Sequence, residues 1–309
     1  MAEDRIQLQP ELTGVALAYR NNTCIADKVF NDVTVEQRSF QYRKYDKETF
    51  LTLPETRIGE KGEANRVEIK GKLVTDSVEE HAIENSISIS RQKEAQNAVN
   101  KVDLSALTIA QLTDILLLRR EVNLATLLST PAIYKGNVKK LEENEKINNP
   151  NVNAVKLIQD AADSMVYKPN KMILSRKAYS ALRQNKYVVS AVNKNDSEAG
   201  IVPLDEIKTL FELDEILVGE SFFNVAKRGA TPNYAACWQN DIILTHNNNV
   251  ATVDYGITFG YRAIYEKITI GSYFDGRSGT QGADVYKAYT SYKDVIACPE
   301  CGYLIEGAV

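Results

Sequence analysis

The chain has 309 residues, a net charge of −4 and a pI of about 5.5, with 44 % hydrophobic and 25 % charged residues. This length predicts two or three domains, because a single hydrophobic core stops growing near this size. The acidic balance argues against a bulk nucleic-acid binder, which would carry a basic surface. No apolar run reaches the roughly 18 residues of a membrane span, since Arg119 and Arg120 interrupt the longest candidate.

The inventory of reactive side chains is thin. General acid–base, metal and nucleophilic chemistry draw mostly on histidine and cysteine, whereas the 16 tyrosines are a residue type favoured at interfaces. The N-terminal MAEDRIQLQPEL is neither a signal nor a transit peptide, so a cytoplasmic origin is expected. We therefore assign no catalytic, cofactor-binding or metal residue. The histidines are His81 and His246, and the cysteines are Cys24, Cys237, Cys298 and Cys301.

Residues 1–33 carry apolar side chains without a sustained period, so they cannot form a core alone. Two alternatives remain open: the segment packs across its own chain, or it lies on another subunit as an arm. Residues 34–76 then show two alternating stretches joined by a polar one, which predicts a long β-hairpin. This hairpin is too polar to bury both faces, so it is either a surface flap or is held by something outside it. The alternating residues are Val33, Val35, Phe40 and Tyr42, then Val67, Ile69 and Leu73.

Residues 76–102 are polar and predict a short helix and loop. His81 lies there among Glu79, Glu80 and Glu84, where a solvated side chain is the expectation. The stretch DLSALTIAQLTDILLLRREVNLATLLSTP follows and predicts one helix over residues 104–128, roughly 37 Å long at 1.5 Å per residue. Asp103 or Thr108 would cap its start, and Pro131 ends it.

This helix carries two apolar stripes on different faces, which predicts burial on two sides. It is either a central core helix, or a spine that covers its own domain and also meets a neighbour. Which stripe has which role stays open. The first stripe is Leu104, Leu107, Ile115, Leu118, Val122 and Ala125, and the second is Ile109, Leu116, Leu117, Leu124, Leu127 and Leu128.

A turn-rich linker leads from the spine helix into about 100 residues in which helix and strand patterns alternate, which indicates a compact α/β domain with one mixed sheet. Helices are predicted over 154–167, 176–192 and 203–211, and strands at KPNKMILS, DEILVGES and from Trp238 to Leu244. Two long β-runs, 257–272 and 284–298, flank the glycine-rich YFDGRSGTQGA, which reads as a hairpin tip rather than a phosphate loop because no helix follows. The apolar tail CGYLIEGAV should dock on the fold.

The sharpest local pattern is Cys298-Pro-Glu-Cys301-Gly, which has the form of one zinc-ribbon knuckle. A tetrahedral zinc needs two further ligands, and no second C-x-x-C exists in the sequence. A redox C-x-x-C should open a helix within a βαβ unit, which this pattern does not do. Two thiols at a strand end in a reducing cytoplasm are the favoured interpretation.

The order of these elements, with YRN and IADKVF, LTDILLLRRE, ILSRKAYSALRQN, LFELDEILVGES and CGYLI in sequence, resembles the major capsid proteins of tailed bacteriophages over nearly the whole chain. The resemblance implies an α+β Hong Kong 97-type capsid fold. It implies an N-terminal arm (1–33), an extended β-hairpin loop (34–76), a peripheral domain with the spine helix (77–149 and 257–298) and an axial α/β domain (150–256 and 299–309).

The same resemblance implies a structural, non-enzymatic protein that self-assembles into homo-pentamers and homo-hexamers of an icosahedral head enclosing double-stranded DNA. Its location would be the virion, after synthesis in the bacterial host cytoplasm. Separate scaffolding and portal proteins, decoration proteins and weak non-specific contact with packaged DNA are the expected partners, with no membrane. A nanocompartment shell protein is the alternative within this fold, and a zinc or redox enzyme centred on Cys298 and Cys301 is the alternative from another class.

Overall fold

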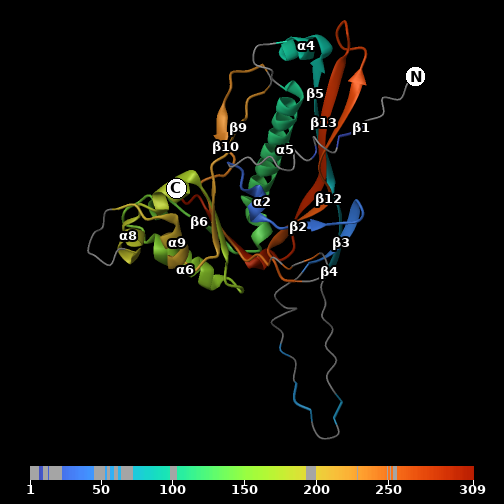
Figure 1. Ribbon diagram of the computed structural model, residues 1–309. Helices are drawn as coiled ribbons and strands as arrows, with labels where there is room; N and C mark the ends of the chain where they lie inside the picture. The colour runs from blue at the N-terminus through green and yellow to red at the C-terminus, as the bar shows by residue number, and fades with distance from the viewer. Residues whose placement is uncertain are drawn as a thin grey trace.

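The computed structural model describes residues 7–9, 13, 23–44, 53, 56–58, 62–63, 72–97, 103–192, 200–227, 229–248, 250, 252 and 256–309. Two sheets organise them (Figure 1). One sheet contains the longest strands, and we call it the long sheet. The other mixes parallel and antiparallel pairs, and we call it the mixed sheet. A single long helix, α5 (Leu104–Leu128), stands beside the long strands.

The long sheet is built on an antiparallel pair formed by the two late β-runs, as predicted. The glycine-containing residues 276–282 turn one strand into the other. Short strands from the N-terminal part add to this pair, so the described pieces of the predicted arm pack on their own chain. The strand order is β1-β12-β13-β5, with β2 parallel to β12; the bounds are β1 (Gln7–Leu8), β2 (Asp32–Thr34), β5 (Glu79–Ser88), β12 (Gly260–Asp275) and β13 (Ala283–Ile296).

Strand β5 corrects the prediction of helix and loop over residues 76–102. It pairs antiparallel with β13, and helix α4 (Ile89–Asn97) starts only where the strand ends. The strand is at the edge of the sheet and mostly exposed, so it needs few apolar residues. Ile83 and Ile87, which share one face, are the residues that pack inward. Two isoleucines in a polar run gave too weak an alternation to predict a strand.

Helix α5 has the predicted bounds. The Asp103 side chain accepts hydrogen bonds from the backbone N–H of Ser105 (2.9 Å) and Ala106 (3.2 Å), which settles the choice of N-cap. Ser129 is the C-cap, and Pro131 begins the short 3₁₀ turn η1 (Pro131–Tyr134).

The mixed sheet has the order β6-β14-β11-β7-β8 and contains the C-terminal strand, so the predicted docking of the tail is confirmed. Strand β6 pairs with β14 and therefore belongs to this sheet, whereas the sequence placed residues up to 149 with the spine helix. The strand predicted from Trp238 begins at Ile242 instead. The strands are β6 (Val138–Lys140), β7 (Lys171–Ser175), β8 (Glu215–Gly219), β11 (Ile242–Thr245) and β14 (Gly302–Glu306).

Four helices cover one face of the mixed sheet. The helix predicted over 176–192 is divided in two, because Asn185 interrupts it: the Asn185 side chain donates to the carbonyls of Ile147 (3.1 Å) and Val152 (3.0 Å). The helices are α6 (Ala154–Ser164), α7 (Arg176–Leu182), α8 (Lys186–Val192) and α9 (Leu204–Leu210); the 3₁₀ turns η2 (Glu143–Glu145) and η3 (Pro299–Cys301) precede α6 and β14.

The mixed sheet is buried on both faces, and its strands alternate between two cores. On β7, Met172 and Leu174 face the helices α6 to α9, whereas Ile173 joins the core that contains Leu124 and Leu128 of α5. The C-terminal half of α5 therefore packs on the mixed sheet. Its N-terminal half packs on the long sheet, where Ile109 contacts the cluster around Ile270. One helix thus joins both sheets.

Two hairpins and a short helix complete the fold. The hairpin predicted over 34–76 forms between β3 (Ser39–Lys44) and β4 (Lys72–Ser77), while Val67 and Ile69 lie outside the described residues. A second hairpin that the sequence did not reveal pairs β9 (Phe222–Asn224) with β10 (Tyr234–Ala236). Helix α2 (Ala26–Val29) lies within the arm, directly before β2.

Candidate assembly interface

The two stripes of α5 have different environments. The second stripe is buried within the chain, with Ile109, Leu124 and Leu128 fully covered. In the first stripe, Leu107 and Ile115 are each 49 % exposed, although they lie in a helix that is otherwise well packed. Large half-exposed aliphatic side chains about two turns apart on the same side of the helix contribute to an apolar surface, and such surfaces mark contact sites. We call this surface the helix face.

The first stripe is not exposed along its whole length. Leu118 and Val122 are partly buried against the core of the mixed sheet, and Ala125 is fully buried in it. Phe223 of the β9–β10 hairpin belongs to the same cluster. At its other end, Leu104 packs on the long-sheet cluster, so the exposed part of the stripe is limited to Leu107 and Ile115 in the N-terminal half of α5.

A buried carboxylate on α5 fixes the N-terminal segment. Glu121 is fully buried and accepts hydrogen bonds from the backbone N–H groups of Ile25 (2.9 Å) and Ala26 (2.7 Å). Trp238 Nε1 (2.5 Å) and Ser221 Oγ (3.3 Å) donate to its other oxygen. Burial raises the pKa of Glu121 against the opposing effect of these donors. Glu121 thus connects the arm, the helix and the segments on both sides of the β9–β10 hairpin.

An ion-pair network lies beside it. Arg262 is fully buried and donates from Nε to Asp294 Oδ1 (2.7 Å) and from Nη1 to Asp27 Oδ1 (2.8 Å). Arg120 Nη1 donates to the same Asp27 oxygen at 2.8 Å. Both guanidinium groups lie over the Tyr292 ring, 4.9 Å (Arg120) and 5.4 Å (Arg262) from its centroid. Burial raises the pKa of Asp27, but the two arginines outweigh it and hold that pKa below its usual range.

Sequence analysis did not single out any residue of this network. Its partners are far apart in the chain, since 235 positions separate Asp27 from Arg262. The sequence did hold one sign of a buried polar site next to the network, namely Glu121. This carboxylate has Leu118 and Leu124 three positions before and after it, in a helix that is predicted to be buried on two sides. Such a residue is either exposed or specifically paired.

The base of the β3–β4 hairpin is part of the subunit core. Phe40 and Tyr42 are buried against Tyr261 and Val295 at the end of the long sheet. Of the two alternatives for this hairpin, the second therefore applies at its base, which is held by residues outside the hairpin. Beyond Lys44, the described Leu53 and Ile58 are 92 % and 50 % exposed.

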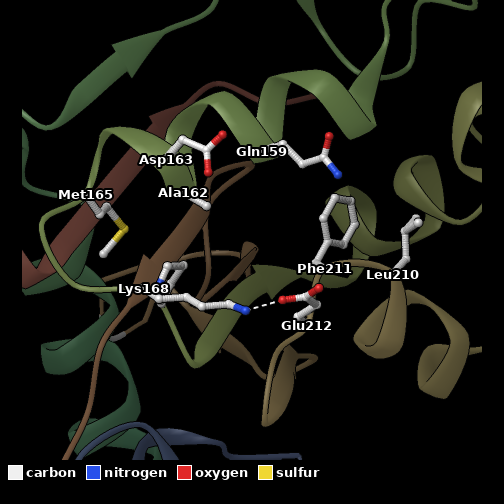
Figure 2. Close-up of a pocket in the computed structure, with 9 residues that line it drawn as sticks. Gln159, Ala162, Asp163, Met165, Lys168, Leu210, Phe211 and Glu212 are labelled. Carbon is white, nitrogen blue, oxygen red and sulfur yellow. Dashed lines mark hydrogen bonds and ion pairs between the residues drawn. The ribbon is translucent and has the colours of Figure 1, made fainter.

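A surface cavity of about 480 Å³ lies between the ends of α6 and α9. Figure 2 shows the Lys168 and Glu212 side chains joined across it, with Asp163 and Gln159 projecting from the helix above. Its nine described lining residues include no histidine, cysteine or serine, so it holds no nucleophile paired with a base. The lining residues are Gln159, Ala162, Asp163, Met165, Lys168, Pro169, Leu210, Phe211 and Glu212.

The unusual backbone at this cavity is explained by a helix end. Glu212 has a φ of 52°, which non-glycine residues rarely adopt. Its N–H donates to the carbonyl of Thr209 (3.2 Å), and the N–H of Leu213 donates to that of Lys208 (3.0 Å). This is a Schellman ending of α9. The strained residue therefore terminates a helix and is no sign of chemistry.

The two histidines have structural partners. His81 stacks on Tyr292, with the ring centroids 4.8 Å apart, so the expectation of a solvated side chain is wrong. Burial lowers the pKa of His81. His246 Nδ1 lies 2.8 Å from the Lys168 carbonyl, and its ring lies near Tyr167.

The four cysteines are reduced, and burial raises the pKa of Cys24 to about 12. Cys298 and Cys301 lie at opposite ends of one turn, with their sulfur atoms 3.0 Å apart. Within the described residues no three histidine, cysteine, aspartate or glutamate side chains are grouped so that they could hold a metal ion. In the same part of the chain, no helix is long and apolar enough to cross a bilayer.

The architecture, with a spine helix beside a long sheet, N-terminal strands on that sheet, the β3–β4 hairpin at its end and a mixed α/β sheet, is the Hong Kong 97-type capsid fold. Among solved structures, a phage-related protein from Bordetella bronchiseptica RB50 shares it with a TM-score of 0.76 at 23 % identity, covering 98 % of both chains. The capsid structure of the cyanophage P-SCSP1u aligns with a TM-score of 0.58 at 11 % identity, covering 93 % of this chain and 89 % of the other. No family model matches the sequence.

A curated relative identifies the family. The major capsid protein of Pseudomonas phage JBD67 is 31 % identical over 310 aligned positions, covering 100 % of this chain and 99 % of the relative. The chain belongs to the phage major capsid proteins. It is a structural component of the virion that assembles into the shell of the phage head, and it is not an enzyme. The nanocompartment and enzyme alternatives are thereby set aside.

Proposed function

We propose that copies of this chain assemble as homo-pentamers and homo-hexamers, and that the helix face and the hairpin beyond Lys44 are contact surfaces between copies. The supporting observation is the half-exposure of Leu107 and Ile115 on a helix whose other apolar stripe is buried. Full burial of such a side chain is worth about 1.5–3 kcal/mol, so covering the exposed half of each would gain about half of that per residue. A neighbouring copy in the shell would recover that free energy.

The β3–β4 hairpin supports the same proposal, because it would be the second surface in a contact between two copies. An isolated two-stranded hairpin is only marginally stable in water. Its base is held by Phe40 and Tyr42, but Leu53 and Ile58 are exposed on a single subunit. Repeating heterologous contacts are what closes a shell around its symmetry axes. Apolar residues on both an extended hairpin and a helix face provide two complementary surfaces for such contacts.

The helix face is tested by Ile115→Asp, with Ile115→Leu as the matched control. Because Ile115 is half-exposed, both variants should keep the wild-type fold by circular dichroism. We expect the Asp variant to yield no closed shells in negative-stain microscopy, and the Leu variant to yield wild-type particles. Normal shells from a folded Asp variant would contradict the contact.

The hairpin is tested by replacing residues 45–71 with a short glycine-containing turn. The replacement keeps the pairing of Lys44 with Lys72 and leaves Phe40 and Tyr42 in the core. We expect a folded subunit that makes no stable shells. A deletion of residues 40–66 would instead remove two core aromatics, Phe40 and Tyr42, and therefore cannot separate folding from assembly.

We also propose the division into arm (1–33), hairpin loop (34–76), peripheral domain and axial domain, with the peripheral domain near the rim of each capsomer and the axial domain near its centre. Supporting it are the separate cores on the two sheets. Because β6 pairs with β14, we include residues from 138 onward in the proposed axial domain in place of a start at residue 150. Electron microscopy of capsomers at subnanometre resolution would test the placement.

Separate scaffolding, portal and decoration proteins, and weak non-specific contact with packaged DNA, complete the proposal. A net charge of −4 suits a wall that does not bind DNA tightly. Expressed alone, the chain should form capsomers or closed shells. Particles from infected cells should contain nuclease-resistant DNA, and binding of free DNA by empty shells should vanish at moderate salt.

A further inference from the structure

The turn that ends with Cys301 connects the two sheets. Strand β13 of the long sheet ends at Ile296, and β14 of the mixed sheet begins at Gly302. Between them, Cys298 N–H donates to the Phe259 carbonyl (3.2 Å), and Cys301 accepts a bond from His246 N–H (2.8 Å). The chain therefore passes from the long sheet to the C-terminal strand of the mixed sheet through this turn.

The turn is also held from outside. The Asn137 side chain donates to the carbonyls of Glu300 (3.2 Å) and Gly302 (3.1 Å), on both sides of Cys301. Gly302 packs so closely on the Phe259 ring that a Cβ would lie 2.2 Å from it. These contacts fix the backbone around both cysteines, so the distance between their side chains is a property of the fold.

The two thiols face each other within this fixed turn. The Cys301 Sγ donates to Cys298 Sγ at 3.0 Å, and both residues are buried, with 4 % and 0 % exposure for Cys298 and Cys301. A disulfide bond is about 2.05 Å long and needs Cβ atoms roughly 3.5–4.5 Å apart. The two sulfur atoms are therefore about 1 Å farther apart than in a disulfide.

We propose that Cys298 and Cys301 form an intrachain disulfide, a modification site that closes the crossover between the two sheets when the particle meets a small neutral oxidant such as hydrogen peroxide. Phage particles leave a reducing cytoplasm for oxidising surroundings, where disulfides form and persist. A peroxide molecule is small enough to enter where larger disulfide reagents are excluded by burial.

The roles of the two sulfurs are different. The hydrogen bond from Cys301 lowers the pKa of Cys298, and the backbone N–H groups of Glu300 and Cys301 add to this against burial. Donating its proton, together with burial, raises the pKa of Cys301 far above its usual range. Cys298 is therefore the attacking thiolate, because the thiolate is the reactive form.

The reaction balances with one peroxide. The Cys298 thiolate attacks an oxygen atom, so an S–O bond forms and the O–O bond breaks, and the leaving hydroxide takes a proton to become water. Cys298 is then a sulfenic acid. The Cys301 sulfur attacks it, the S–S bond forms, the S–O bond breaks, and the second hydroxide leaves as water with the Cys301 proton. Two thiols and one peroxide thus give one disulfide and two waters.

The test treats assembled full-length particles with hydrogen peroxide, removes the excess with catalase, and counts thiols by alkylation after denaturation. The wild type should fall from four alkylated cysteines to two, with the cross-link mapped to Cys298 and Cys301 and reversed by a phosphine reductant. Four remaining thiols, a cross-link between Cys24 and Cys237, or irreversible sulfonic acid at Cys298 would each overturn the proposal. The peptide map of the wild type needs no variant to fold.

Two sets of variants sharpen the result. The Cys24→Ser/Cys237→Ser double variant should still form the cross-link. The Cys298→Ser/Cys301→Ser double variant should keep both of its remaining thiols, Cys24 and Cys237, after peroxide treatment. Among single variants, Cys301→Ser should leave a Cys298 sulfenic acid that dimedone traps, and Cys298→Ser should keep Cys301 as a thiol at least ten times longer under the same treatment. Equal reactivity of the two single variants would refute the assigned roles.

Discussion

The two sheets differ in how much of their surface the chain itself covers. The mixed sheet is covered on both faces by its own chain, and the strands β7 and β11 that lie at its centre are buried at every position. The long sheet is covered by α5 on one side, while its edge strand β5 and much of the helix face remain open to solvent. The mixed sheet and the helices α6 to α9, which we call the mixed-sheet unit, thus bury their central strands within one subunit. The long sheet and α5, which we call the long-sheet unit, leave apolar surface open, and this is where we propose that neighbouring copies bind.

The two units also differ in how polar groups are used. The core between the mixed sheet and α6 to α9 is almost wholly aliphatic. Where the long sheet meets the N-terminal segment, the structure instead buries Arg262 among carboxylates and Glu121 among hydrogen-bond donors. Buried polar networks of this kind are directional and permit one arrangement of the segments they join. The region that joins segments far apart in the sequence is therefore the region with the polar network.

The largest effect is expected where α5 contacts the mixed sheet. Leu124 is fully buried in the core shared with Ile173, so Leu124→Asp places an unpaired charge in an apolar site. The cost should exceed about 4 kcal/mol and leave no folded subunit. Circular dichroism and solubility would measure this. Ile115→Asp on the opposite stripe is the control, because its half-exposed site should tolerate the charge in the unassembled subunit. Equal loss of fold in both would show that α5 has no open face.

The next effect tests the network at Arg262. Arg262→Met removes a fully buried cation and leaves Asp294, itself nearly buried, without its partner. Breaking a buried ion pair in this way costs about 3–5 kcal/mol, which urea unfolding of the unassembled subunit would measure. Lys140→Met is the matched control in the mixed-sheet unit, because Lys140 is exposed and its pair with the partly exposed Glu306 should contribute about 0–1 kcal/mol. A cost for Arg262→Met no larger than that of the control would contradict the network's role.

The long elements of both units could be predicted from the sequence. Helix α5 and the strands β12 and β13 are long enough for periodicity, caps and glycine turns to agree. Strand β7 was equally clear, because a short apolar run between turn signals indicates a buried strand. Order of elements then identified the fold class without any single diagnostic motif.

The missed features are those whose signal is not local. Strand β5 and the β9–β10 hairpin are exposed, so their sequences need not alternate strongly. Arg262 and Asp27 come together only because β12 passes α2, and nothing within either local sequence requires the pairing. The same holds for the roles of the two helix stripes, because their different exposure depends on where the mixed sheet packs. Contacts set by tertiary packing lie beyond patterns of adjacent residues.

A smaller effect compares turns of the two units. Gly282, at the tip of the long hairpin, has a φ of 82°, and a Cβ there would lie 2.2 Å from the Phe274 ring. Gly136, next to the mixed sheet, has a φ of 100° with open space around it. Alanine at Gly136 should cost about 1–2 kcal/mol from the backbone alone. Gly282→Ala should cost more, up to about 3 kcal/mol, because Phe274 must also move. Urea unfolding of both variants would show whether the difference is real.

The smallest effect is a pH dependence at Glu121. Its pKa is raised in the folded chain by burial, so above the ordinary glutamate pKa of about 4.3 the folded state holds a proton that the unfolded state has lost. The free energy of unfolding of the wild type should therefore fall relative to Glu121→Gln as the pH rises from 4.3 through the folded pKa. Unfolding by urea across this range measures the difference.

The matched control for that pH series is Glu212→Gln in the mixed-sheet unit. The hydrogen bond and charge of Lys168 lower the pKa of the exposed Glu212, so its contribution is complete above about pH 4.3 and is lost only on further acidification. Above about pH 5 the Glu212 difference should be flat, whereas the Glu121 difference should decline until the pH has passed its raised pKa. If the Glu121 difference is also flat or rises with pH, the donors from Ile25, Ala26 and Trp238 outweigh burial. The Glu121 carboxylate would then be ionised, with a pKa at or below the ordinary glutamate value.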